Sequence, residues 1–215
     1  MLKNKKVVFF SLVICLLFFV LTGCAKRQIK NINSKGTNII CFGDSITFGH
    51  GANPSEDYPS VLSNMTNLTV INAGADSDTS VDGLQRIDSD VLEKDPLLVI
   101  IEFGGNDFLK KIPTEETLHN IKTMVDRIQA KGAMVAIFDI SAGMIMSHYR
   151  GLFRNIASEK QAIFIPDLLK GIITDPQLKS DFIHPNNIGY KMVASRIYRA
   201  ILPYLNQNTL TKHQK

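Results

Sequence analysis

The chain has 215 residues, of which 45% are hydrophobic and 20% are charged, so it is long and apolar enough for one globular domain with a substantial core. It contains only 14 glycines and 8 prolines, which excludes collagen-like, low-complexity and intrinsically disordered chains. The formal net charge is +4, but residues 1–23 hold three lysines and no acidic residue, which leaves 21 basic and 20 acidic residues in the rest. We therefore expect no nucleic-acid-binding surface.

The first 23 residues are typical of a targeting segment. Lysines precede an uncharged apolar run over residues 7–21, which is shorter than the roughly 20 residues that a membrane-spanning helix needs. The run ends in Leu21-Thr22-Gly23-Cys24, which resembles the lipobox of bacterial lipoproteins. We therefore expect a signal peptide over residues 1–23, lipidation of Cys24, and an extracytoplasmic, membrane-anchored bacterial lipoprotein. The alternative is an uncleaved transmembrane helix.

The rest of the chain divides into three parts. Residues 24–36 are polar and rich in lysine and asparagine, which predicts a flexible tether, and residues 206–215 have the composition of a polar tail. A single domain is expected over residues 37–205. Cys41 lies in an apolar run and is expected to be a buried strand residue, so we expect no disulfide in the mature chain.

Apolar runs alternate with helical patterns along this domain. The apolar runs are rich in valine, isoleucine and phenylalanine, and they predict buried strands over residues 38–42, 68–72, 97–103, 133–138 and 162–165. Apolar residues at three- and four-residue spacing predict one helix from Thr114 to Gly132 and another from Asn186 to Pro203, with weaker helical patterns over residues 58–64, 81–92 and 144–158. This alternation predicts an α/β fold with a mostly parallel sheet and helices on both faces.

Polar residues follow several predicted strands, where the carboxyl ends of parallel strands form ligand sites. Ser45 follows the first strand, Gly74 follows the second, and Asn106 follows the third. Asp181 and His184 lie in the loop before the last helix. These segments are therefore expected to converge on one crevice.

The residue types are those of nucleophilic acyl transfer. Ser45 can act as the nucleophile, His184 as its base, and Asp181, three residues earlier, as the carboxylate that orients the imidazole. Donors for the oxyanion could be the backbone N–H groups of Ser45 and Gly74 and the side-chain amide of Asn106. Taken alone, each of these residues could instead only form a turn or cap a helix.

The motifs that carry these residues resemble four blocks of the GDSL, or SGNH, hydrolase family. They are Phe42-Gly43-Asp44-Ser45-Ile46-Thr47, Gly74, Gly104-Gly105-Asn106-Asp107 and Asp181-Phe182-Ile183-His184-Pro185. The similarity extends to the group of bacterial arylesterases, lysophospholipases and acyl-CoA thioesterases. The resemblance implies a flavodoxin-like three-layer sandwich whose five-stranded parallel sheet has the order 2-1-3-4-5. It also implies the residue roles just given, with no metal and no cofactor.

The function expected is hydrolysis of acyl esters or thioesters through an acyl-enzyme, and the alternative within the family is a carbohydrate O-acetylesterase of the cell envelope. A metallophosphoesterase using Asp44, Asn106, Asp107 and His184 is disfavoured because no second histidine falls near Asp44 or Asn106. A binding lipoprotein with a degenerate site ranks last. His50 lies near the nucleophile block and could approach the site, but a loop histidine is usually solvated. The expected partners are a small-molecule or lipid ester and the membrane at Cys24, with no obligate protein partner.

Overall fold

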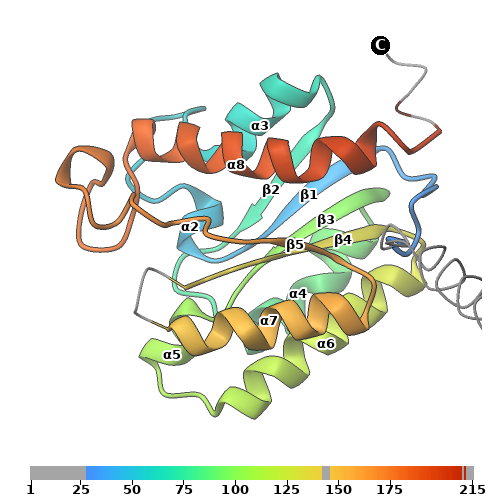
Figure 1. The fold of residues 1–215 in the computed structure, drawn as a ribbon, viewed down its shortest axis with the longest axis horizontal. Helices are drawn as coiled ribbons and strands as arrows, with labels where there is room; N and C mark the ends of the chain where they lie inside the picture. The colour runs from blue at the N-terminus through green and yellow to red at the C-terminus, as the bar shows by residue number, and fades with distance from the viewer. Residues whose placement is uncertain (1–27, 142–145, 210, 212–215) are drawn as a thin grey trace, which may run out of the picture.

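The computed structural model describes residues 28–141, 146–209 and 211, which form a three-layer α/β sandwich around one parallel sheet (Figure 1). The sheet has the strand order β2-β1-β3-β4-β5, so the expected order 2-1-3-4-5 is confirmed. Its strands are β1 (Asn38–Gly43), β2 (Val70–Gly74), β3 (Pro96–Glu102), β4 (Met134–Phe138) and β5 (Ile163–Ile165). All neighbouring strands pair in parallel.

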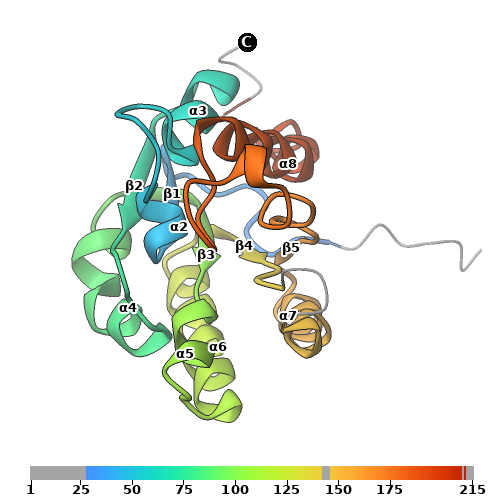
Figure 2. The ribbon, with the colours of Figure 1, turned by 90° about the vertical axis from the view of Figure 1, so that its left-hand side faces the viewer.

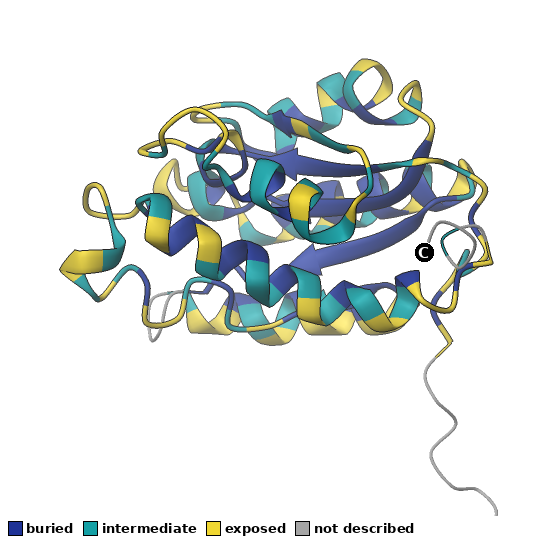
Figure 3. Ribbon diagram, turned by 90° about the horizontal axis from the view of Figure 1, so that it is seen from above, coloured by how far each residue is buried: buried dark blue, intermediate teal, exposed yellow. Residues whose placement is uncertain are grey.

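The central strands are buried on both faces, as their continuous apolar sequences predict. Every residue of β3 and β4 is buried, and the strands lie in the buried middle layer of the molecule (Figure 3). Cys41 is a free, buried cysteine of β1, and burial raises the pKa of its thiol far above the usual range. The second strand lies two residues later than predicted, because its position is set by pairing with β1 from Ile39↔Val70 to Gly43↔Gly74.

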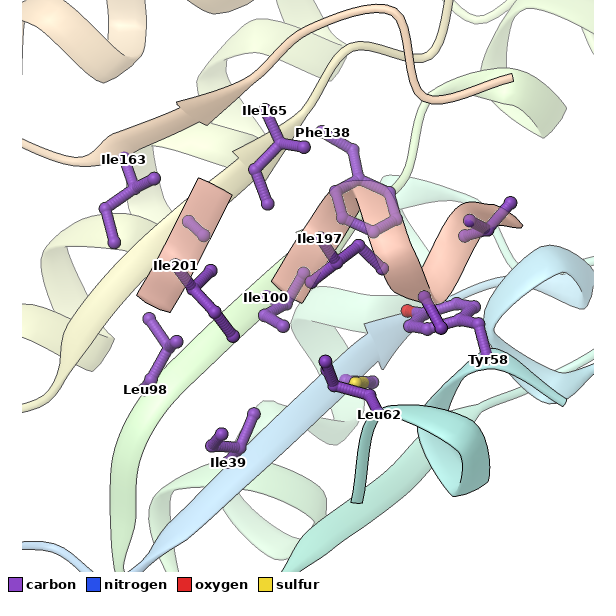
Figure 4. Packing of buried hydrophobic residues seen from close by; sticks show 14 of the residues in the cluster. Ile39, Tyr58, Leu62, Leu98, Ile100, Phe138, Ile163, Ile165, Ile197 and Ile201 are labelled. Atoms are coloured by element: carbon purple, nitrogen blue, oxygen red, sulfur yellow. The ribbon is translucent and has the colours of Figure 1, made fainter. Parts of the chain in front are cut away.

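Helices cover both faces of the sheet. Helices α3 (Tyr58–Thr66) and α8 (Asn187–Leu205) lie on one face, and α4 (Ser80–Ile87), α6 (Thr114–Ala130) and α7 (Ser147–Glu159) lie on the other (Figure 1). Each face has its own core cluster. In the first cluster, Tyr58 and Leu62 of α3 and Ile197 and Ile201 of α8 pack against the strands (Figure 4).

Several helix ends differ from the sequence-based expectations. The last helix continues through Pro203 to Leu205, because a proline in the final turn removes only one intrahelical hydrogen bond. The cap of α6 is Pro113 rather than Thr114, and its side chain makes no capping hydrogen bond. The helical pattern over residues 81–92 is divided into α4 and a π-helical turn, η1 (Asp88–Leu92). Two further helical turns, α5 (Gly105–Leu109) and η2 (Pro176–Leu178), complete the described helices together with α2 (Ser45–Phe48).

The described part of the expected tether, residues 28–36, is folded onto the domain. Ile29 is buried in the core, and Asn31 Nδ2 donates to the backbone oxygens of Gln129 and Ala133. Asn208, from the expected polar tail, is also buried and donates to the backbone oxygens of Ile32 and Ser34. The expectation of a flexible stretch is therefore wrong for residues 28–36. The segment is polar overall, but burial of Ile29 and the hydrogen bonds of Asn31 are enough to hold it against the domain.

The targeting segment and Cys24 lie outside the described residues. Among the residues that are described, none of the helices has the length and hydrophobicity required to cross a bilayer.

Candidate active site

The predicted site residues come together at the carboxyl end of the sheet, which faces the viewer in Figure 2. Helix α2 follows β1, α5 follows β3, and the loop between η2 and α8 reaches over the same end of the sheet (Figure 2). This is the edge at which open parallel sheets bind ligands.

Ser45 is the first residue of the short helix α2. Asp44 caps this helix, since its Oδ1 accepts a hydrogen bond from the N–H of Ile46 at 3.0 Å. The helix ends at Gly49, which adopts the left-handed conformation with φ 95°. The Ser45 hydroxyl is thus held at the end of the sheet by β1 before it, by the Asp44 cap and by the short helix that ends at Gly49. The expectation that Asp44 braces this loop is confirmed.

His184 is held by a tight turn that starts at Asp181. Oδ1 of Asp181 accepts hydrogen bonds from the backbone N–H groups of Ile183 and His184, both at 2.9 Å. The turn is closed by the N–H of Ser180, which donates to the His184 oxygen at 2.9 Å. Asn186 then caps α8 through the N–H groups of Ile188 and Gly189. The imidazole is therefore fixed by its own loop rather than by a distant element.

The three side chains form a continuous hydrogen-bonded chain. His184 Nδ1 lies 2.7 Å from Oδ2 of Asp181, and His184 Nε2 lies 2.9 Å from Oγ of Ser45. Although partial desolvation opposes it, the pKa of Asp181 lies far below its usual range, because the imidazole and two backbone N–H groups donate to the carboxylate. Asp181 is therefore ionised and accepts the Nδ1 proton, which leaves Nε2 as the acceptor for the Ser45 hydroxyl.

Gly74 and Asn106, the other two residues predicted as oxyanion donors, already have protein acceptors for their N–H groups. The N–H of Gly74, which pairs with Gly43 in the sheet, donates to Oδ1 of Asn72 at 2.9 Å. Nδ2 of Asn106 lies 3.2 Å from Oδ2 of Asp44 and 2.9 Å from the Asp78 backbone oxygen. An incoming oxygen could accept from these N–H groups only by displacing the present acceptors or by sharing the donors with them; catalytic hydrogen bonds of empty sites are often not yet in their final geometry.

Sequence reasoning gave no role to Glu102, yet it contacts the residues on both sides of Ser45. Its Oε2 accepts hydrogen bonds from the Thr47 hydroxyl at 2.9 Å and from the N–H of Asp44 at 3.2 Å. Burial, and then the nearby negative charge of Asp44, raise the pKa of Glu102 well above its usual range. Glu102 and Asp44 thus form a buried carboxyl pair that braces α2, and burial favours the protonated form of Glu102. The signal that could have found Glu102 was a single charged residue in the apolar run over residues 97–103.

Of the residues of the disfavoured metallophosphoesterase, Asn106 lies beside Asp44, but Asp107 is directed away from them. Asp107 points toward α4 and α6, where it accepts hydrogen bonds from the backbone and hydroxyl of Ser80 and from Thr117 Oγ1. Among the described residues, the group that could hold a metal is instead His50, Asp181 and His184. The proximity of His50 was underestimated from the sequence, and its ring lies against that of His184.

An apolar pocket opens beside Ser45. It has a volume of about 150 Å³ among the described residues, and its apolar walls include Phe108, Leu109, Ile140, Met146, Leu168, Leu169, Ile173 and Ile183. Leu109 and Ile183 are exposed at its rim.

The known proteins to which this chain is similar include lipases, acylhydrolases and esterases. Residues 41–192 match the model of the GDSL-like Lipase/Acylhydrolase family. The chain is 24% identical to Esterase TesA of Pseudomonas aeruginosa, over 86% of this chain and 98% of that protein. It is 26% identical to the Arylesterase of Vibrio mimicus, over 88% of this chain and 96% of that protein. The solved structure of the psychrotrophic esterase EstA from Pseudoalteromonas sp. matches with a TM-score of 0.71 and 25% identity, covering 79% of this chain and 99% of that one.

Proposed function

The chain belongs to the GDSL-like lipase/acylhydrolase family and is an esterase, and we propose that it cleaves acyl esters through a covalent acyl-enzyme on Ser45. The observation that carries the proposal is the hydrogen-bonded chain from Asp181 through His184 to Ser45, with distances of 2.7 and 2.9 Å. A serine hydroxyl, a base and an orienting carboxylate are the parts that this chemistry needs.

The proposed reaction has two halves. Ser45 Oγ attacks the ester carbonyl carbon while His184 Nε2 takes the hydroxyl proton, and the protonated imidazole then gives that proton to the leaving alcohol. Water attacks the acyl-enzyme in the same way, with His184 again as base, and releases the acid. Asp181 stays ionised throughout and stabilises the imidazolium.

The developing oxyanion is proposed to bind the N–H groups of Ser45 and Gly74 and the side-chain amide of Asn106. Support comes from the placement of Gly74 at the end of β2 and of Asn106 in the first turn of α5, which follows β3; β2 and β3 are the two strands that flank β1. Donors held by such packed elements need little reorganisation when charge develops.

The pocket supports an ester with a short or medium acyl chain. An apolar cavity of about 150 Å³ is of the size that accepts a benzene-sized group, which corresponds to about six carbons. Its apolar walls favour such a chain over an acetyl group on a sugar, because an acetyl group leaves most of this surface unfilled.

Hydrolysis of nitrophenyl esters from acetyl to dodecanoyl, with acetylated xylan alongside, tests the substrate class. We expect kcat/KM to rise with chain length, to peak near six carbons and to fall beyond. Preference for acetyl esters together with release of acetate from xylan would replace this proposal with the carbohydrate O-acetylesterase.

We also propose that Cys24 carries a lipid anchor. Only residues 25–27 separate it from Gln28, where the described domain begins, so an extended chain there spans roughly 10 Å. The described chain begins at the end of the sheet opposite α2 and α5 (Figure 1). The active site therefore faces away from the anchoring membrane. Fractionation of cells that make Cys24→Ser tests the anchor: release from membranes supports it, and unchanged membrane association and size contradict it.

A further inference from the structure

A second histidine lies against the catalytic base. His50 directly follows the glycine that ends α2, and its backbone N–H donates to the backbone carbonyl oxygen of Ser45 at 3.0 Å. Its ring centroid lies 4.3 Å from that of His184, with 36° between the ring planes. Its carbonyl accepts a hydrogen bond from the Tyr190 hydroxyl at 2.9 Å, so the residue is held on both sides.

Both ring nitrogens of His50 face carboxylates. Nδ1 lies 3.4 Å from Oδ2 of Asp76, and Nε2 lies 4.0 Å from Oδ2 of Asp181. When Nδ1–H donates to Asp76, the lone pair of Nε2 is directed toward Asp181. Histidines that bind metals are commonly oriented in this manner, with the second ring nitrogen donating to a carboxylate.

We propose that His50, Asp181 and His184 form an inhibitory site for a divalent transition metal of the Zn²⁺ type. One ligand atom from each residue lies within 4.8 Å of the others. Tetrahedral Zn²⁺ with bonds of about 2.0–2.1 Å separates its ligand atoms by about 3.3 Å, so small side-chain shifts complete the site. His50 and Asp181 are each nearly half exposed, which gives the metal access and leaves room for a water ligand.

The donor set favours this class of metal. Two imidazole nitrogens and one carboxylate oxygen suit Zn²⁺, whereas Mg²⁺ prefers oxygen ligands in octahedral geometry. Asp76 does not bind the metal in this arrangement; it orients His50 from behind.

Binding at Nδ1 of His184 blocks the proposed base. The Nδ1 proton passes to water and the freed lone pair binds the metal, while Nε2 takes a proton from water, so the neutral imidazole then carries its single proton on Nε2. Nε2 consequently donates to Ser45 Oγ and cannot take its proton. This inhibition rests on the proposed function, whereas metal binding itself does not.

The experiment titrates ZnCl₂ into the full-length chain without a histidine tag and measures both hydrolysis of a nitrophenyl ester and the heat of binding. We expect Zn²⁺ to inhibit, a chelator to restore full activity, and Mg²⁺ to have no effect. The His50→Gln variant should keep basal activity within a few-fold and need at least about tenfold more Zn²⁺ for half-inhibition. The matched control His119→Gln changes another exposed histidine, on α6, and should respond like the wild type.

Calorimetry on Ser45→Ala separates this inference from the proposed function. Ser45 is not a ligand, so the variant should bind Zn²⁺ normally while it hydrolyses nothing. Equal Zn²⁺ sensitivity of His50→Gln and wild type, or no heat of Zn²⁺ binding with Ser45→Ala, overturns the metal site. Retained hydrolysis by Ser45→Ala would instead overturn the serine mechanism and leave the binding result standing.

Discussion

Gly74 is proposed to donate its backbone N–H to the oxyanion, and its lack of a side chain allows the close approach of α2. The Gly74→Ala substitution separates these two roles. Alanine keeps the backbone N–H that is proposed as an oxyanion donor. It adds a Cβ atom, which would lie 2.1 Å from the Phe48 nitrogen and 2.5 Å from the Thr47 carbonyl carbon. The change therefore acts on the position of α2 rather than on the number of donors.

The size of the effect follows from these contacts. Ordinary van der Waals contact for a Cβ atom begins at 3.4 Å, so the α2 backbone must move by about 1.3 Å, the difference from 2.1 Å. Ser45 opens this four-residue helix, so it moves with it. A misplacement of about 1 Å can lower the rate about 10²-fold, and overpacking costs about 1–3 kcal/mol of stability. We expect a folded variant with kcat lowered by about 10² or more.

Steady-state kinetics and thermal unfolding on the same preparation provide the test. Gly151→Ala in α7 is the matched control, because no described residue lies within 4 Å of the added Cβ atom. It should keep normal turnover and gain up to about 1 kcal/mol of stability. A Gly74→Ala protein that melts cooperatively and turns over within a few-fold of wild type refutes the reasoning.

Three other substitutions test neighbouring parts of the site. Asn106→Ala should lower kcat by about 10² to 10³ with little change in KM, whereas a bracing role alone predicts a lower melting temperature and near-normal kcat in steady-state assays. Glu102→Gln should stay folded and active within a few-fold because burial favours the neutral form of Glu102, which glutamine resembles. Glu102→Ala should lose about 2–4 kcal/mol in denaturant unfolding, and the opposite order of the two variants contradicts a neutral Glu102. Asp181→Asn should lower kcat by about 10⁴. Because the pKa of Asp181 is lower in the folded than in the unfolded chain, its stabilising contribution is present above about pH 4 and is lost as the pH falls further. The melting temperature of the wild type should therefore be lower at pH 2.5 than at pH 5, by an amount that solvent screening of Asp181 reduces. The decrease should be smaller in Asp181→Asn, and equal decreases in the two proteins contradict this contribution of Asp181.

The sheet was predictable because its strands are short, apolar on both faces and separated by helical patterns. Their exact bounds were not, since the position of β2 depends on pairing with β1 rather than on its own residues. Helix α5 was missed because Gly104-Gly105 is typical of a turn, and only the surrounding fold allows a helix to start there.

The convergence of Ser45, His184 and Asp181 was predictable, but the hydrogen bonds around them were not. The order of Ser45, Asn106 and the Asp181-to-His184 turn along the chain placed them at one sheet edge. Their spacing could not show that Asn72 occupies the N–H of Gly74, because that contact depends on a side-chain rotamer. Nor could it show that His50 lies against His184, since this contact joins loops that are more than a hundred residues apart.

The central claim is that Ser45 is the nucleophile. Incubation of the full-length chain with a fluorophosphonate ester, followed by intact-mass and peptide mass spectrometry, tests it most directly, because a fluorophosphonate reacts with an activated serine hydroxyl and leaves a stable adduct. We predict one adduct, located on Ser45, with hydrolysis lost in proportion to labelling. We also predict no labelling of Ser45→Ala and strongly slowed labelling of Asp181→Asn. Full loss of activity with the adduct on another residue, or full activity in a fully labelled protein, would contradict the account.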